Sequence, residues 1–93
     1  MEISVYGLMR LDSPKIVDIR SSDKFYMGHI PGSINIPYQD LILNPSRYLN
    51  VDNVYYLYCQ KGITSLKCMY NLRDKGYDVI SVAGGYDSFM NYS

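Results

Sequence analysis

One cysteine in the chain occupies a position at which a reactive thiol would be stabilised. Cys59 directly follows the apolar run 54–58 and shortly precedes the amphipathic segment 64–75. Backbone N–H groups at the start of a helix have no acceptor within the helix, and the helix dipole adds partial positive charge there. A thiolate at such a point is stabilised, so more of the sulfur is present as the nucleophile. The spacing therefore predicts an anion-binding turn with Cys59 as a reactive thiol rather than a small core residue.

The residues that follow Cys59 suit a turn of this kind. Lys61 adds a mobile cation, and Gly62 permits a backbone turn that a β-carbon would obstruct. We therefore predict Cys59 as the catalytic residue and the rest of the segment as substrate-binding residues: Gln60, Lys61, Gly62, Ile63, Thr64 and Ser65.

Other residues that could do chemistry have simpler interpretations. Asp18 and Arg20 are predicted to form a structural pair that supports the loop, with a direct substrate contact by Arg20 as the alternative. Cys68 lies on the apolar stripe of segment 64–75, which favours a core residue over a redox partner for Cys59. One histidine, His29, and two cysteines cannot complete a four-ligand zinc site, so we expect no metal and no cofactor.

The elements that must position these residues alternate along the chain. Short runs rich in β-branched or aromatic residues predict strands at 15–19, 34–36, 54–58 and 78–82, with an edge strand at 2–5. The segments between them suit helices at 6–11, 22–27, 38–43, 64–75 and 86–91, and the turn-rich interval 44–53 suits a connection. Such alternation predicts an α/β fold with three layers, a small parallel sheet flanked by helices on both faces. Ligands collect at the carboxyl ends of parallel strands, where Cys59 falls.

Length and charge exclude several classes of function. The 93 residues have the size of one domain, which we place at 1–93, and nine basic residues balance nine acidic ones. Without a broad field of positive charge we expect no nucleic-acid partner, and without a long apolar run we expect no membrane partner. Two cysteines without a signal peptide are expected to be reduced thiols in a cytoplasmic protein.

Four segments resemble the signatures of the rhodanese superfamily, and they occur in the family's order. Residues 59–64, Cys-Gln-Lys-Gly-Ile-Thr, resemble the active loop of thiosulfate sulfurtransferases, often Cys-Arg-Lys-Gly-Val-Thr. Residues 17–20 resemble the family's Asp-x-Arg, and residues 26–37 resemble its Gly-His-Ile-Pro-Gly-Ala-x-Asn-x-Pro. Residues 82–89 resemble the closing Gly-Gly-x-x-x-Trp, with Phe89 in place of Trp. The resemblance covers about residues 15–89.

The resemblance implies a two-step transfer of a sulfane sulfur. Cys59 would attack the outer sulfur of a donor such as thiosulfate, release sulfite and hold the sulfur as a persulfide. The persulfide would then pass its sulfur to cyanide, a thiol or a protein acceptor. The loop amides would stabilise the persulfide, while Lys61 would hold the sulfonate end of thiosulfate. Thr64, which matches the last position of the family's loop, would offer a hydroxyl close to the anion, and Ser65 could contribute a second hydroxyl or cap the helix. Gln60 stands where the loop often has Arg, which removes one cation.

Two other functions compete with this hypothesis. Cell-cycle phosphatases and arsenate reductases resemble rhodanese but have a loop one residue longer that ends in Arg. Here Ser65 stands at that position, so a phosphate would lack its bidentate partner. The second alternative is a non-catalytic interaction module, or a carrier that delivers a persulfide to a specific protein. Cys59 and Lys61 argue against an inactive module but do not separate a carrier from an enzyme.

Overall fold

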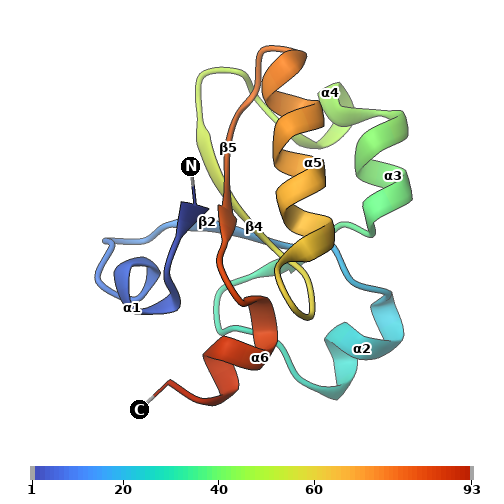
Figure 1. Ribbon diagram of the computed structural model, residues 1–93. Coiled ribbons are helices and arrows are strands. Elements are labelled where there is room, and N and C mark those ends of the chain that lie inside the picture. The colour runs from blue at the N-terminus through green and yellow to red at the C-terminus, as the bar shows by residue number, and fades with distance from the viewer. Residues whose placement is uncertain (1, 93) are drawn as a thin grey trace.

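A five-stranded parallel sheet runs through the middle of the protein (Figure 1). The computed structural model describes residues 2–92. The strands, in the order β1-β5-β4-β2-β3, are Glu2–Ile3 (β1), Asp78–Val82 (β5), Val54–Tyr58 (β4), Lys15–Asp18 (β2) and Ile34–Asn35 (β3). Every neighbouring pair is parallel, and β4 lies at the centre. The predicted α/β fold is confirmed.

Helices cover both faces of this sheet. They are Val5–Leu8 (α1), Ser22–Met27 (α2), Tyr38–Leu43 (α3), Pro45–Tyr48 (α4), Ile63–Asp74 (α5) and Gly85–Met90 (α6). Figure 1 shows α3, α4 and α5 together on one side of the strands and α1 and α6 on the other. The helix α4 falls inside the interval expected to be a connection, so that expectation is wrong. Its single turn begins at Pro45, whose fixed φ suits the first position of a helix.

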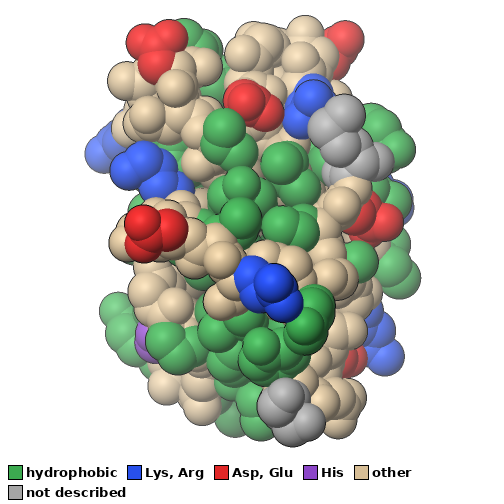
Figure 2. Space-filling model, turned by 90° about the vertical axis from the view of Figure 1, so that its left-hand side faces the viewer, with side chains coloured by type: hydrophobic (Ala, Val, Ile, Leu, Met, Phe, Trp, Pro, Cys, Tyr) green, Lys and Arg blue, Asp and Glu red, His purple; other side chains and the backbone are tan. Residues whose placement is uncertain are grey.

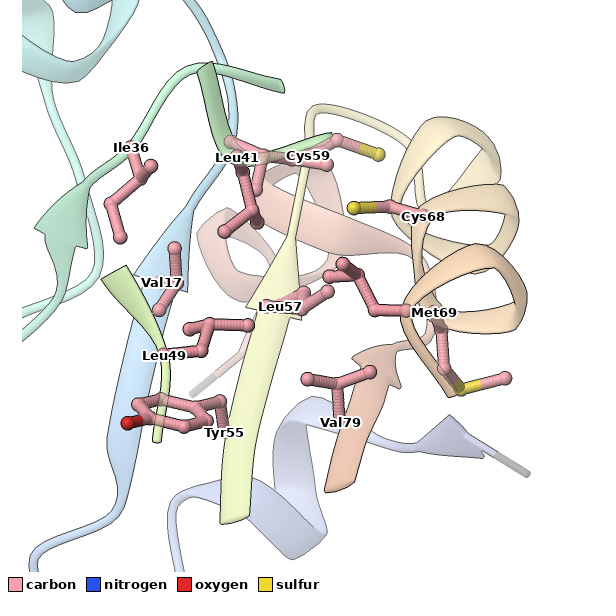
Figure 3. Close-up of a cluster of buried hydrophobic side chains, with 12 residues drawn as sticks. Val17, Ile36, Leu41, Leu49, Tyr55, Leu57, Cys59, Cys68, Met69 and Val79 are labelled. Carbon is pink, nitrogen blue, oxygen red and sulfur yellow. The ribbon is translucent and has the colours of Figure 1, made fainter. Parts of the chain in front are cut away.

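Alternation along the central strand β4 explains why both faces need cover. Tyr55 and Leu57 pack into the cluster beneath α3 and α5, part of which Figure 3 shows. Tyr56 and Tyr58 point the other way, toward α1 and α6. Successive side chains of a strand point to opposite faces, so an almost wholly apolar strand is stable only when both faces are buried. Leu57 and Tyr58 are accordingly 0% exposed.

The surface retains some apolar side chains outside these two clusters. Figure 2 views the side on which α1 lies and shows hydrophobic side chains gathered between charged ones. Tyr6, Met9 and Leu11 are exposed in this part of the chain. Small domains have too little polar surface to cover their cores, so exposure of this kind is ordinary. Among residues 2–92, no helix has both the length and the apolar character needed to span a bilayer.

The register of the two central strands brings distant parts of the chain together. Asp18 at the end of β2 is paired with Tyr58 at the end of β4, and Ile19 N–H donates to the Tyr58 carbonyl at 3.0 Å. The chain therefore leaves both strands at the same edge of the sheet. Arg20 follows one strand and Cys59 follows the other, so these two residues emerge side by side.

Candidate active site

The Cys59 sulfur receives two backbone hydrogen bonds. The N–H groups of Gly62 and Ser65 each donate to Sγ, both at 3.2 Å. These amides lie at the start of α5, which begins at Ile63, and so belong to the group that has no acceptor within the helix. The positive end of the helix dipole adds to their effect. This arrangement favours a negatively charged sulfur.

Gly62 makes the turn that directs these amides inward. Its φ of +94° lies in the left-handed region, which residues with a β-carbon rarely adopt. A β-carbon at this position would also lie 2.8 Å from the backbone nitrogen of Gly84. Both backbone conformation and packing therefore require glycine at this point of the loop.

The start of α6 supports the loop from the other side. The N–H of Tyr86 donates to the carbonyl of Cys59 at 2.9 Å, and the N–H of Asp87 donates to that of Gln60 at 3.0 Å. Gly85 allows this approach, because a β-carbon there would come within 2.3 Å of the Cys59 carbonyl oxygen. These two hydrogen bonds fix the loop against α6, while the N–H groups of Gly62 and Ser65 donate to the sulfur.

Asp18 and Arg20 form a buried ion pair beside the loop. Arg20 Nη2 lies 2.7 Å from Asp18 Oδ2, and Nε donates to both carboxylate oxygens at 3.1 and 3.0 Å. Arg20 Nη2 also donates to the Gly28 carbonyl at 2.7 Å, and the guanidinium lies 4.2 Å from the centre of the Tyr86 ring. Burial alone would lower the pKa of Arg20, but the hydrogen bond and charge of Asp18 outweigh burial and raise it. The guanidinium is therefore fixed and charged.

Gln60 is bound at both ends of its side-chain amide. Its Oε1 accepts from Arg20 Nη1 at 3.1 Å, and its Nε2 donates to Asp87 Oδ1 at 2.6 Å. The side chain thus completes a chain of polar contacts from Asp18 through Arg20 and Gln60 to Asp87. In this arrangement Gln60 links the loop to β2 and α6 instead of pointing freely at a substrate.

A cavity of about 330 Å³ opens at the cysteine. It is lined by Ile19, Arg20, Ser21, Lys24, Cys59, Gln60 and Thr64. Cys59 is 7% exposed and reaches solvent through this cavity. A second cavity of about 440 Å³ shares Arg20, Lys24 and Gln60 with the first, so the two adjoin. Lys24 is absent from the residues that sequence reasoning selects, although its place on a helix just after β2 could have indicated it.

Four of the six loop residues predicted to bind substrate line neither cavity: Lys61, Gly62, Ile63 and Ser65. Gly62 and Ser65 instead donate their N–H groups to the Cys59 sulfur. Lys61 is exposed at the surface, and the Ile63 side chain is 63% exposed. Thr64, in contrast, lines the cavity at Cys59. The structure therefore brings together Cys59, Gln60 and Thr64 and places Lys61 outside the cavity wall.

Two buried hydroxyl groups lie behind the cysteine. Ser65 Oγ is 3.5 Å from Cys59 Sγ and 2.7 Å from Ser81 Oγ. Both serines are 0% exposed. Sequence reasoning includes Ser65 but misses Ser81, which comes from β5 and has no motif of its own.

Two further reactive side chains lie outside the cavity. Cys68 on α5 is 0% exposed, and its sulfur points toward Cys59 within the core (Figure 3). Burial, together with the nearby Cys59, raises the pKa of Cys68 to about 12. His29 is exposed, and its ring stacks on Phe25 with centroids 3.8 Å apart. Both side chains have packing roles in this structure.

Fold and site together define a class of protein: a three-layer parallel α/β domain that holds a cysteine sulfur in an amide-lined turn at the start of a helix. A family model described as the rhodanese-like domain matches residues 4–92. The chain belongs to the rhodanese-like family.

Individual relatives agree with this assignment. Thiosulfate sulfurtransferase GlpE of Shewanella oneidensis is 31% identical over 91 residues, covering 94% of this chain and 89% of GlpE. A probable molybdopterin-synthase adenylyltransferase of Porphyra purpurea is 30% identical over 82% of this chain, which corresponds to 20% of that protein. Among solved structures, SSP1007 of Staphylococcus saprophyticus superposes with a TM-score of 0.85 at 32% identity, covering 96% of this chain and 93% of SSP1007.

These relatives differ greatly in length. The chain spans between 20% and 57% of three of its curated relatives, whereas it spans most of GlpE. Sulfurtransferases are among its relatives, which supports a transferase at the level of the superfamily.

Proposed function

We propose that this protein is a sulfurtransferase that moves a sulfane sulfur from thiosulfate, or a similar donor, to a thiophilic acceptor through a persulfide on Cys59. The observation that carries the proposal is the pair of N–H groups, from Gly62 and Ser65, directed at Cys59 Sγ. These donors favour an anionic sulfur at the mouth of a cavity large enough for a small donor.

In the first step the Cys59 thiolate attacks the outer sulfur of thiosulfate. A new S–S bond forms to Sγ, and the bond between the two thiosulfate sulfurs breaks. Sulfite leaves with the electron pair of that bond, so one negative charge remains on the outer sulfur of the persulfide. The amides at the start of α5 would stabilise this charge, because backbone N–H groups in a turn form a concave site for anions.

In the second step an anionic acceptor attacks the outer sulfur of the persulfide. With cyanide the products are thiocyanate and the Cys59 thiolate, and with a thiolate they are a new persulfide and the Cys59 thiolate. The electron pair of the broken S–S bond returns to Sγ in both cases. The cycle therefore needs no cofactor and no net change in oxidation state of the protein.

The charges around the cavity suggest how an anionic donor is held. Lys24 lines the cavity beside Cys59, and Arg20 adds a second positive charge that Asp18 balances. We assign the sulfonate end of thiosulfate to Lys24, with Lys61 adding longer-range attraction from the loop surface. Gln60 would keep the loop in place through Arg20 and Asp87.

A second candidate is a persulfide carrier for a protein acceptor. The match to one fifth of a much larger adenylyltransferase supports it, since there a domain of this kind is one part of a longer chain. A carrier would use the first step described above and deliver its sulfur to a particular protein instead of turning over with cyanide.

Intact-mass spectrometry tests both candidates. After incubation with thiosulfate, the wild-type protein should gain the mass of one sulfur atom. Cys59→Ser should gain nothing, while Cys68→Ala serves as the matched control and should gain the same mass as wild type. Thiocyanate released over many turnovers with cyanide supports an enzyme, whereas a single loaded sulfur that cyanide does not remove catalytically supports a carrier. A wild-type protein that gains no sulfur from thiosulfate or another sulfane donor contradicts both.

A further inference from the structure

The buried serine pair behind Cys59 is an arrangement that a purely apolar core would not contain. Ser65 Oγ contacts both Cys59 Sγ, at 3.5 Å, and Ser81 Oγ, at 2.7 Å. Both residues are 0% exposed, so water does not compete for these hydroxyl groups. A buried hydroxyl without a partner is costly, and each serine here has its partner in the other serine or in the sulfur.

The direction of the hydrogen bonds depends on the charge of the sulfur. When Cys59 is a thiol, its S–H can donate to Ser65 Oγ, and the Ser65 hydroxyl then donates to Ser81. In that state the hydrogen of the Ser81 hydroxyl finds no acceptor among residues 2–92. When Cys59 is a thiolate, Ser65 donates to Sγ and Ser81 donates to Ser65, so every hydroxyl hydrogen in the chain has an acceptor. Successive hydrogen bonds of this kind strengthen one another.

We propose that Ser81 is a positioning residue that donates to Ser65 and so directs the Ser65 hydroxyl at Cys59 whenever that sulfur is anionic. The sulfur then has three donors: the N–H groups of Gly62 and Ser65 and the Ser65 hydroxyl. Ser81 acts only through Ser65, since its hydroxyl contacts the Ser65 hydroxyl and not the sulfur.

The Ser65 hydroxyl can change its hydrogen-bond partner as the negative charge moves during the proposed sulfur transfer. In this respect the inference rests on the proposed function. Once the persulfide forms, the negative charge lies on the outer sulfur, and Sγ becomes a weak acceptor. The Ser65 hydroxyl can then turn back to Ser81 and leave the amides to the outer sulfur. When the acceptor removes that sulfur, Sγ regains its charge and attracts the Ser65 hydroxyl again.

Other ionisable groups around Cys59 must be held constant in any test. Arg20 and Lys24 face the cavity from the segment after β2, Lys61 lies on the loop, and Cys68 lies on α5. Substitutions at the two serines change no formal charge among these groups. A change in the titration of Cys59 can therefore be assigned to the lost hydroxyl.

The test measures the rate at which iodoacetamide alkylates Cys59 between pH 5 and about pH 9, followed by intact-mass spectrometry. The midpoint of this profile gives the pKa of Cys59, because the thiolate is the reacting species. Ser65→Ala should raise the midpoint by about one unit, an approximately tenfold loss of thiolate below the midpoint, as expected for one lost charge-assisted hydrogen bond. Ser81→Ala should raise it by roughly half as much, since Ser65 keeps its own hydroxyl but loses its donor.

A double-mutant cycle separates a relay from two independent effects. If Ser81 acts through Ser65, the double variant should titrate like Ser65→Ala alone. The proposal is overturned if Ser81→Ala leaves the midpoint unchanged. It is also overturned if Ser81→Ala shifts the midpoint equally in the wild-type protein and in the Ser65→Ala variant. Because the reagent is not a sulfur donor, the result is independent of whether thiosulfate loads the protein.

Two further variants control for structural effects. Ser81→Thr retains the hydroxyl and should keep the native midpoint, so a shift as large as that of Ser65→Ala would contradict the relay. Ser33→Ala removes another buried hydroxyl, which contacts Tyr58 at 3.2 Å and not the sulfur. It should leave the midpoint unchanged, and a shift there would mean that packing, not the relay, sets the titration of Cys59.

Discussion

Replacement of Arg20 by alanine should strongly destabilise the fold, although Arg20 lies in the connection between β2 and α2. The guanidinium makes three contacts of 2.7 to 3.1 Å with the Asp18 carboxylate and also binds the Gly28 carbonyl and Gln60. Asp18 is 0% exposed, so alanine at position 20 would leave its carboxylate buried without a counter-charge. The loop would lose its link to β2 at the same time.

The expected magnitude follows from the burial of the pair. Removing one partner of a buried ion pair costs about 3–5 kcal/mol, because the remaining charge stays desolvated. For a domain of this size each kcal/mol lowers the melting temperature by about 4–8 °C, so Arg20→Ala should lower it by about 12 °C or more. Arg20→Lys should recover only part of this loss, since an ammonium cannot reproduce the planar, multiply bonded contact.

Urea denaturation followed by circular dichroism measures this free energy directly. Arg73→Ala is the matched control: Arg73 Nη1 lies 3.6 Å from Asp78 Oδ1 in a pair whose side chains are 33% and 52% exposed, and it donates to the Val79 carbonyl at 2.9 Å. That change should cost only about 1 kcal/mol, as is usual for a solvent-exposed pair and a single hydrogen bond. If Arg20→Ala and Arg73→Ala cost the same, the buried pair does not hold the loop in the way described.

Two more predictions follow from the cavity and the core. Lys24→Ala should raise the KM for thiosulfate by about two- to fivefold, and by more than Lys61→Ala does. Neither variant should change the KM for an uncharged sulfane donor. Equal effects of the two variants on the KM for thiosulfate would contradict the role of Lys24. Burial raises the pKa of the Cys68 thiol from 9.0 to about 12, so the unfolded chain loses this proton at a lower pH than the folded protein does. The free energy of unfolding should therefore fall as pH rises from 9 toward 12, by up to about 1.4 kcal/mol per pH unit. Urea titrations at pH 8, 9 and 10 should show a smaller decline for Cys68→Ala, and an identical decline would refute this assignment.

The sheet could be predicted from sequence because its strands have a strong local signal. The runs at 54–58 and 78–82 are apolar and β-branched or aromatic, and they are strands over those same bounds. The helix α4 could not be predicted in this way. It has four residues, Pro45–Tyr48, and too few apolar positions to show a helical period, so its stability depends on contact with α3.

The candidate site, like the fold, has one part that could be predicted from the sequence and one part that could not. The turn from Cys59 to Ser65 is encoded locally, since a glycine and the start of a helix lie within a few residues of the cysteine. The partners of Gln60 and Ser65 are not local: Asp87 is 27 residues away and Ser81 is 16 residues away. Asp87 stands at a variable position of the Gly-Gly-x-x-x-Trp-like segment, and Ser81 lies outside every motif. Only the packing of α6 and β5 against the loop brings them into contact.

The groups that hold the loop in place are different from the groups that contact its sulfur. The loop is anchored by Arg20 and by the start of α6, through its carbonyl groups and the Gln60 side chain. The sulfur is contacted by N–H groups of the loop and α5 and by the Ser65 hydroxyl. Because the two sets share no donor, loss of the Arg20 contacts should lower stability first, whereas loss of the Ser65 or Ser81 hydroxyl should raise the pKa of Cys59 in a protein that still folds.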